Sequence, residues 1–423
     1  MRAFWVITIS LCLIAEICSA FELPDRRRDQ YGKDFAYYVY PIPGEIPGVG
    51  TAFGVGASVL NIGGNDADVT AYALRGDFDA TGITLLDLHL IKQRLVFDVG
   101  YNDYLVSAKQ YERGIDSPGD DFILPTVTGR YLLAQMTLTY DQRRYEYYYR
   151  VLRGENRLLK ILDKDLNEFE SFDDDTHGQR GQVIGLSFDF TDDRLDPRRG
   201  FRFEAAAKLP NSGDEENSEF YTLDFNFTQY FPLRKWDTLV FNLFHSQSHV
   251  TKEAETDFNK LQQSIGLDCQ NEPAGADREQ CLQTEAQFIN QRISANKYGF
   301  AASLGGTQRL RSYDNYRFYA GNAFFYGLEY RWNLTDEYTP FNIYVAKGVR
   351  TGMQLAFFVE QGSVSDRQSK LFDEMRTSYG VGFRLILSGV IVRLDFARGD
   401  DGKSARQIFI TYPFSMFSVD NPG

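Results

Sequence analysis

The feature that most constrains this chain is a period-two alternation of apolar and polar side chains, which dominates everything after the first few tens of residues. Tyr326, Leu328 and Tyr330 fall on one face of an extended segment, for example, whereas Glu329 and Arg331 fall on the other. Successive side chains of a β-strand point to opposite faces, so this pattern indicates strands and not helices. Segments of about ten residues, joined by turns that are alternately short and long, are typical of a transmembrane β-barrel whose apolar side chains face lipid. A secreted all-β domain would also alternate, but the number and length of the segments favour the barrel.

Fifteen segments carry the pattern clearly, and parity requires a sixteenth. Single-chain bacterial barrels contain an even number of strands, so that both ends of the chain emerge on the same side of the membrane. Residues 34–40 supply the extra strand, although Pro41 and Pro43 follow it and proline is rare inside a sheet. We therefore predict an all-β fold, a 16-stranded antiparallel transmembrane β-barrel over residues 34–414. The other strands are 49–60, 68–76, 82–91, 94–106, 130–141, 143–153, 182–193, 200–209, 218–231, 237–249, 322–333, 351–361, 377–388, 390–399 and 404–414. The long connections are 107–129, 154–181, 250–321 and 362–376.

Composition excludes several other classes of protein. Mean hydropathy is −0.36, and after the first 20 residues no apolar run reaches the ~18 residues that a bilayer-spanning helix needs. The chain is therefore not a polytopic helical membrane protein. Its 45 Lys and Arg residues are outnumbered by 58 Asp and Glu residues, which argues against nucleic acid as a partner because phosphate binding needs clustered cations. With 26 Tyr and 34 Phe residues, the chain is also too aromatic for a disordered protein.

The first twenty residues have the pattern of a secretory signal peptide. Arg2 supplies the positive charge, the residues up to Ile17 are mostly apolar, and Ser19 and Ala20 offer small side chains for cleavage. Lipidation at Cys18 and an uncleaved N-terminal anchor are the alternatives. An exported barrel is expected in the outer membrane of a Gram-negative bacterium. The expected organisation is a signal peptide (1–20), a short periplasmic segment (21–33), the barrel (34–414) and a short C-terminal tail (415–423).

Beyond the signal peptide the chain contains two cysteines, Cys269 and Cys281, within one polar stretch. In an exported protein, two neighbouring cysteines favour a disulfide, which here would staple a loop and not the core. Two free thiols are the alternative. A metal site is disfavoured because no histidine lies beside them.

Two further stretches are more specific than alternation. The first lies between two predicted strands and fits D-x-R-x-x-P-x-x-G through Asp192, Arg194, Pro197 and Gly200. The second is Gly305-Gly306-Thr307-Gln308-Arg309-Leu310-Arg311-Ser312-Tyr313, followed by strands that contain Glu329-Tyr330-Arg331 and Phe358-Val359-Glu360-Gln361-Gly362. Together, and in this order, they resemble the BamA/TamA-like outer-membrane assembly barrels, also called the bacterial surface antigen family. The resemblance covers essentially the whole chain after the signal peptide, most clearly residues 182–414.

The resemblance implies a long surface loop that folds inward. In that family a (V/I/L)-R-G-(F/Y) motif lies at the tip of such a loop, inside the barrel lumen. The matching residues here are Leu310, Arg311 and Tyr313, and Ser312 stands at the position of the family's glycine. Assembly barrels usually also carry periplasmic POTRA domains before the barrel, and we expect this chain to lack them because residues 21–33 are too few for one.

Alternation points to two candidate lumen partners for the loop tip that the resemblance places inside the barrel. Glu329 and Glu360 both fall on the polar faces of their strands, so both carboxylates should point inward. An arginine that enters a partly desolvated lumen needs a carboxylate partner, and its planar guanidinium suits paired hydrogen bonds. We therefore expect Arg311 to pair with Glu329, Glu360 or both. A solvated loop arginine is the alternative.

The first motif is expected to be mainly structural. Pro197 and Gly200 favour a rigid tight turn, and Asp192 and Arg194 would satisfy its polar groups. In the family this stretch is a periplasmic turn, which agrees with the strand parity above.

The resemblance implies an integral outer-membrane insertase or translocase of the BamA/TamA type. Its first and last strands would open sideways, and a client strand would add to the exposed edge. A barrel without POTRA domains that acts as a pore, or as a membrane platform for a separate partner protein, is the alternative. We find no catalytic motif and expect no enzyme activity, no cofactor and no metal. Expected partners are outer-membrane lipids and lipopolysaccharide, unfolded outer-membrane protein clients or a periplasmic or surface partner, and no nucleic acid.

Overall fold

The computed structural model describes residues 35–411, apart from positions 167, 195, 211–216, 235–236, 266–268, 270–274 and 388–389. The expected signal peptide (1–20), the segment after it (21–33) and the expected tail (415–423) lie outside the described residues.

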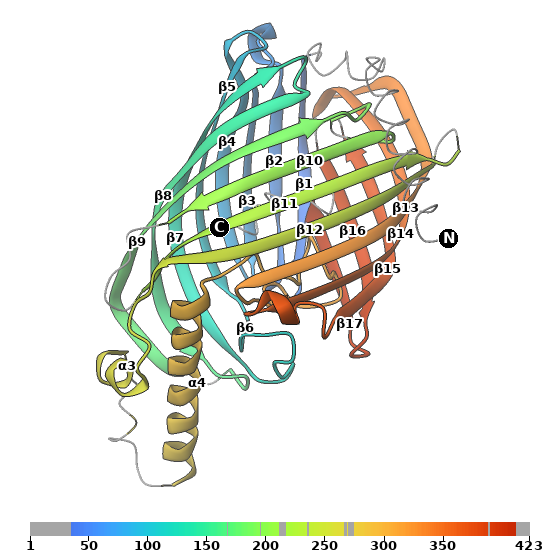
Figure 1. Ribbon diagram of the computed structural model, residues 1–423. Coiled ribbons are helices and arrows are strands. Elements are labelled where there is room, and N and C mark those ends of the chain that lie inside the picture. Colours follow the sequence, from blue (N-terminus) through green and yellow to red (C-terminus); the bar gives the residue numbers. More distant parts are fainter. Residues whose placement is uncertain are drawn as a thin grey trace, which may run out of the picture.

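Sixteen antiparallel strands form one closed barrel wall (Figure 1), which confirms the predicted fold class. A further strand of two residues, β6, pairs only with the beginning of β7 and is not part of the wall. The strands are β1 (Ala36–Ile46), β2 (Gly50–Leu60), β3 (Asp68–Gly76), β4 (Asp79–Ile91), β5 (Leu95–Ser107), β6 (Gln110–Tyr111), β7 (Phe122–Tyr140), β8 (Tyr145–Leu162), β9 (Glu168–Asp189), β10 (Gly200–Leu209), β11 (Glu219–Pro232), β12 (Asp237–Lys252), β13 (Asn322–Ile343), β14 (Ala346–Ser365), β15 (Arg376–Leu387), β16 (Val390–Gly399) and β17 (Ser404–Ile410).

The wall is apolar outside and polar inside, the reverse of a soluble protein. In β11 the side chains of Thr222, Asp224 and Asn226 are buried toward the lumen, whereas Phe225 between them is 41% exposed on the outside. The same parity runs around the barrel, so large apolar side chains cover the outer face. This arrangement follows from the alternation in the sequence, because each strand must present one face to each side of the wall.

The two ends of the barrel differ. At the loop end, residues 253–321 leave the wall between β12 and β13; at the opposite turn end, β1 begins and β17 ends. The loop carries two helices, α3 (Phe258–Ile265) and α4 (Ala276–Tyr298). Figure 1 shows α4 extending away from the barrel at this end. Among the described residues, no helix combines the length and apolar character needed to cross a membrane.

The expected long connection 154–181 is wrong. β8 continues to Leu162 and β9 begins at Glu168, so most of this stretch is paired strand. The ladder continues through pairs such as Asn156 with His177. Backbone hydrogen bonds hold a ladder together whatever the polarity of the side chains, so a polar stretch beyond the apolar band can remain a strand.

The barrel closes between its first and last strands. Among the described residues, β17 meets β1 at one residue pair, Glu45 with Ile408. The Arg406 guanidinium adds an ion pair to Glu45 across this seam, with 2.6 Å between Nε and Oε2. Nearer the turn end, β1 pairs instead with β14, through Tyr37 with Lys347.

The two prolines of β1 lie on its seam edge. Val39 donates its backbone N–H to Val345 of the β13–β14 turn, at 3.1 Å, so odd-numbered residues of β1 direct their N–H groups toward the seam. Successive residues of a strand alternate in this direction. Pro41 and Pro43 therefore remove two donors from the seam edge and none from the ladder with β2, and the expected strand 34–40 extends through both prolines to Ile46.

Candidate functional site in the barrel lumen

The second part of the long loop, residues 299–321, turns back into the lumen. Leu304 and Phe318 form a small antiparallel bridge, in which each backbone N–H donates to the other residue's carbonyl at 2.8 and 2.9 Å. Beyond the bridge, Leu310 and Tyr313 are buried and pack with inward apolar side chains of β12 and β13. The loop tip thus builds a small apolar core inside a lumen that is otherwise polar.

The turn at the tip depends on three left-handed residues. Gly305 and Gly306 have φ of +107° and +95°, and Leu310 has φ of +52°. Ser312, at the position of the motif's glycine, is not among the described residues with positive φ. Its backbone N–H donates to Ser378 Oγ at 3.0 Å. Serine fits this position because its backbone does not adopt a positive φ.

Arg311 is fully buried at the tip and contacts three carboxylates. Its Nε lies 2.7 Å from Glu360 Oε1, its Nη2 2.9 Å from Glu329 Oε2, and its Nη1 3.0 Å from Asp395 Oδ2. The backbone N–H of Arg311 also donates to Glu360, at 2.9 Å. The guanidinium stacks on Phe358, with 3.4 Å from Cζ to the ring centroid. The structure therefore brings together Arg311, both expected glutamates and a third carboxylate.

Two of the three carboxylates, Glu329 and Asp395, are shared with other inward arginines. Glu329 also accepts from Arg331 at 2.8 Å and Arg384 at 2.9 Å. Arg393 lies 3.5 Å from Asp395 and donates to the carbonyl of Thr307 at 2.5 Å. The cluster contains four arginines and three carboxylates, none of whose side chains is more than 2% exposed. Charges buried this deeply depend on one another, because each would be costly without its partner.

The loop tip is also tied to the first hairpin of the barrel. Asn315 donates its backbone N–H to the carbonyl of Pro47, in the β1–β2 turn, at 2.8 Å. Asp314 accepts from Lys109 Nζ at 3.1 Å and from the hydroxyl of Tyr111 in β6. Burial and the neighbouring Asp314 raise the pKa of Tyr111, so the phenol keeps its proton and donates it. The loop therefore connects the cluster on β13, β14 and β16 to the start of the barrel.

At the turn end, the D-x-R-x-x-P-x-x-G stretch forms the β9–β10 turn. Asp192 Oδ1 accepts the backbone N–H groups of Arg198 at 2.8 Å and Arg199 at 3.0 Å, and so closes the turn around Pro197. Gly200 has φ of +95°, and a Cβ there would collide with the carbonyl oxygen of Phe190, just after β9. Three of the motif residues therefore act within the turn.

Arg194, the fourth residue of this motif, reaches beyond the turn. Its Nη1 lies 2.7 Å from Glu146 Oε1 of β8, which also accepts from Arg143 at 2.7 Å. Arg143 in turn contacts Asp87 of β4 at 2.5 Å. This chain of ion pairs joins the β9–β10 and β7–β8 turns to strands β8 and β4 at one end of the barrel.

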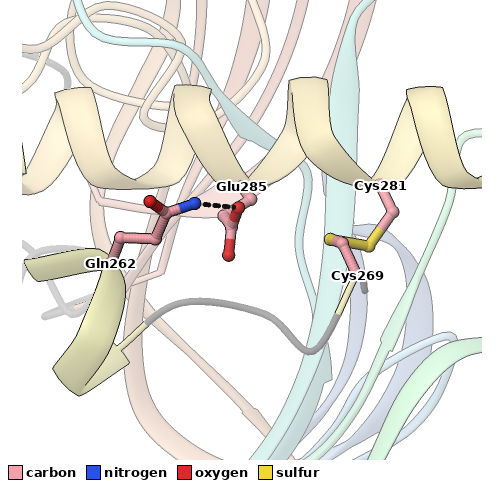
Figure 2. The surroundings of a disulfide bond; sticks show 4 residues. All are labelled: Gln262, Cys269, Cys281 and Glu285. Atoms are coloured by element: carbon pink, nitrogen blue, oxygen red, sulfur yellow. Dashed lines mark hydrogen bonds between the residues drawn. A yellow bond between two sulfur atoms is a disulfide. The ribbon is translucent and has the colours of Figure 1, made fainter. Parts of the chain in front are cut away.

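At the loop end, Cys269 and Cys281 form a disulfide that joins the start of α4 to the segment after α3 (Figure 2). Figure 2 also shows Gln262 of α3 donating to the buried Glu285 of α4, at 2.8 Å. The disulfide and this hydrogen bond fix the two helices to each other. Among the described residues, no group of three or more His, Cys, Asp or Glu side chains is placed to hold a metal ion.

Comparison with known proteins decides the family. The Omp85 superfamily domain matches residues 126–410, which is more than half of the 423-residue chain. The chain belongs to the Omp85 superfamily. The match begins in β7 and ends at the last residue of β17, so it includes the lumen loop, its carboxylate partners and the β9–β10 turn. No curated protein matches this Omp85 chain in sequence.

Solved structures are similar in fold. The barrel resembles BamA from Haemophilus ducreyi lacking POTRA domains 1–3, with 12% identity, a TM-score of 0.47, and coverage of 89% of this chain and 70% of that one. It also resembles CdiB from Acinetobacter baumannii, with 11% identity, a TM-score of 0.49, and coverage of 89% of this chain. CdiB from Escherichia coli gives 10% identity, a TM-score of 0.48 and the same coverage of this chain. The Omp85 chain spans 59% and 62% of these two CdiB chains, under two thirds of their length.

Reasoning from the sequence missed part of the lumen cluster. Asp395, Arg384 and Arg393 were not among the expected partners of Arg311. Each lies on the inward face of β15 or β16, where the same alternation that marked Glu329 and Glu360 would have placed it. Alternation lists the inward residues of every strand, and it does not say which of them the loop tip reaches.

Proposed function

We propose that this Omp85 barrel lies in the outer membrane of a Gram-negative bacterium and assists the insertion or export of other proteins through the seam between β1 and β17. Membership of a superfamily of outer-membrane barrels supports the location, as does the apolar outer face of the wall. The proposed partners are lipids and lipopolysaccharide at that face, and unfolded outer-membrane proteins at the seam. A periplasmic or surface protein that supplies the clients is a further proposed partner.

The observation that carries this proposal is the weakness of the seam. Among the described residues, β1 and β17 share one residue pair, whereas β1 and β2 share eleven. Pro41 and Pro43 remove two donors from the seam edge of β1. A strand edge with few partners is the place where a foreign strand can add to a sheet.

The lumen loop favours this function over an open pore. Residues 299–321 place an apolar core and the Arg311 cluster across the lumen, so the wall does not enclose an empty channel at this level. The loop also ties β13, β14 and β16 together on one side of the seam. A group of strands held together in this way, beside a weakly paired seam, suits a barrel that opens between β1 and β17 by thermal motion.

The test is to lock the seam. Glu45→Cys with Ile408→Cys places two thiols on directly paired residues. We expect the oxidised protein in proteoliposomes to lose its ability to speed the folding of a urea-unfolded outer-membrane barrel. Folding of this client is measured by its heat-modifiable mobility on gels. Reduction should restore the activity.

A matched pair within a continuous ladder controls for the disulfide itself. Phe203→Cys with Phe227→Cys joins β10 to β11, far from the seam, and should leave the activity unchanged whether oxidised or reduced. Equal activity of the locked and unlocked seam would contradict the proposal.

A further inference from the structure

The strands of the β13–β14 hairpin are longer than the strands that follow them in the wall. These strands have 22 and 20 residues, whereas β15, β16 and β17 have 12, 10 and 7. The ladder between β14 and β15 ends at Thr351 with Leu387, and the hairpin continues beyond it to Ala346. The remaining five residues of β14 extend the hairpin by about 17 Å at 3.3 Å per residue. That is close to the distance of about 19 Å from β14 to β1 across the three strands between them, which is four spacings of about 4.8 Å.

The tip of this hairpin occupies the edge of β1. Tyr37 pairs with Lys347, Tyr38 with Ala346, and Val39 donates its N–H to the turn. These are the residues of the seam edge that precede Pro41, and they retain the donors that the prolines lack. The hairpin therefore covers the half of the edge that is competent to pair.

Gly348 brings the two backbones together. It has φ of +72°, and a Cβ at this position would lie 2.9 Å from the carbonyl oxygen of Phe35, just before β1. Both the left-handed backbone and the close approach require glycine here. A side chain at this position would push the tip away from β1 without changing β1 itself.

Side chains from the ends of the short strands fill the space behind β1. Tyr38, Tyr40 and Ile42 point inward from β1 and form a buried cluster with Ala346 and Val349 of the hairpin. Three residues of β15, β16 and β17 pack against this cluster, although each has the parity of the outward face in its own strand. These residues are Leu387, Val390 and Ile410. At the turn end, the described parts of the short strands therefore lie on the lumen side of β1, and no described residue of these strands pairs with its edge there.

We propose that the hairpin tip, residues 342–349, is a built-in cover strand on β1, and that an extended strand of a client protein must displace it before pairing with this edge. This inference rests on the proposed function and adds its regulation. A tethered strand has an effective concentration in the millimolar range, so a free strand at micromolar concentration competes poorly while the cover is in place. The hairpin tip thus prevents free strands at low concentration from pairing with β1.

The experiment measures access to β1 directly. The probe is a synthetic peptide of residues 342–349 with cysteine in place of Lys347, and the trap is Tyr37→Cys in the full-length chain. Peptide trapping by disulfide formation should be low in Tyr37→Cys alone. Adding Gly348→Val should raise it about tenfold, because the tethered competitor is weakened. Ala346→Arg, which places a charge in the buried cluster, is a second variant with the same expected effect.

Gly402→Val is the matched control. Gly402 has φ of +78° in the β16–β17 turn, and a Cβ there would meet nothing within 4 Å. It carries the same backbone strain and should leave trapping at the low level. The folding of each variant is checked by its heat-modifiable mobility. Equal peptide trapping in all folded variants would contradict the proposal that the hairpin tip covers β1. Trapping could rise in Gly348→Val while the seam lock leaves client folding unchanged. That combination would support the cover on β1 and reject the proposed function.

Discussion

Arg311 is the residue on which the lumen loop depends. Its guanidinium contacts carboxylates from three different strands, so a single side chain links β13, β14 and β16 through the loop. The side chain has no exposed surface. Removing it would leave Glu360 with no salt-bridge partner among the described residues, while Glu329 and Asp395 would retain the other arginines of the cluster.

We expect Arg311→Ala to lower the free energy of unfolding by about 3–5 kcal/mol, the usual cost of removing one partner from a buried ion pair. Urea unfolding of the refolded protein in detergent would measure this. Arg311→Lys should lose less, because an ammonium keeps the charge but cannot form the planar contacts. Arg130→Ala, which breaks an exposed pair with Glu155, is the control and should cost under about 1 kcal/mol. Similar losses for Arg311→Ala and Arg130→Ala would argue against a structural role for the cluster.

Asp192 holds the β9–β10 turn by accepting two backbone N–H groups. Hydrogen bonds to a charged acceptor contribute about 1.5–3 kcal/mol, so Asp192→Ala should destabilise the barrel by an amount in this range. Asp192→Asn keeps one acceptor oxygen and should lose less. The midpoint of thermal unfolding checks both variants. A neutral Asp192→Ala would show that Pro197 and Gly200 are sufficient for the turn.

At the scale of residues, the sequence predicted which side chains point into the lumen but not which of them contact one another. The inward faces of Glu329 and Glu360 followed from parity within their own strands. The contact of Arg311 with Asp395 depends on how a strand 84 residues away is placed around the barrel. A periodicity within one strand carries no information about such a long-range relation.

Among the elements, the apolar band of each strand could be predicted and the ends could not. Together with the even-number rule that added β1, the alternation marked all sixteen strands of the wall. It failed for the outer parts of β8 and β9, where polar residues continue the ladder, and for α4, which lies in a stretch expected to be a loop. Among the described side chains of α4, Cys281, Glu285 and Ile289 are buried at a four-residue spacing, but the polar Glu285 interrupts this stripe, so the sequence shows no continuous apolar face.

The disulfide belongs to the helical part of the loop and not to the wall. We expect Cys281→Ser to raise the rate of trypsin cleavage within residues 258–298 roughly a hundredfold, because closing a loop of this size restrains the unfolded state by about 3 kcal/mol and each 1.4 kcal/mol is about a factor of ten. The heat-modifiable mobility of the barrel should not change. Wild-type protein treated with a reductant is the matched control and should behave in the same way. A lower melting temperature of the wall in Cys281→Ser would show that the disulfide supports the barrel as well.

At the scale of the whole molecule, two devices close the barrel. The lumen loop fills the interior from the loop end, and the β13–β14 hairpin covers the edge of β1 at the turn end. The loop also reaches the β1–β2 turn through Asn315 and Pro47, so the lumen loop and the β13–β14 hairpin both contact the first hairpin of the barrel. Since β1 is also the weakly paired strand of the seam, opening of the barrel should depend on both.

The filled lumen makes a last prediction about conduction. We expect the intact barrel to show small and fluctuating currents in planar bilayers, because the Arg311 cluster and the apolar core of residues 299–321 obstruct the lumen. Replacing residues 300–318 by a short Gly-Ser linker should give a steady conductance several-fold larger, since polar side chains then line an open interior. A variant without residues 258–297, which removes α3 and most of α4 outside the barrel, is the control and should conduct like the intact protein. A large and steady current through the unmodified chain would instead identify a pore, and the loop would then be a lining of the channel and not its plug.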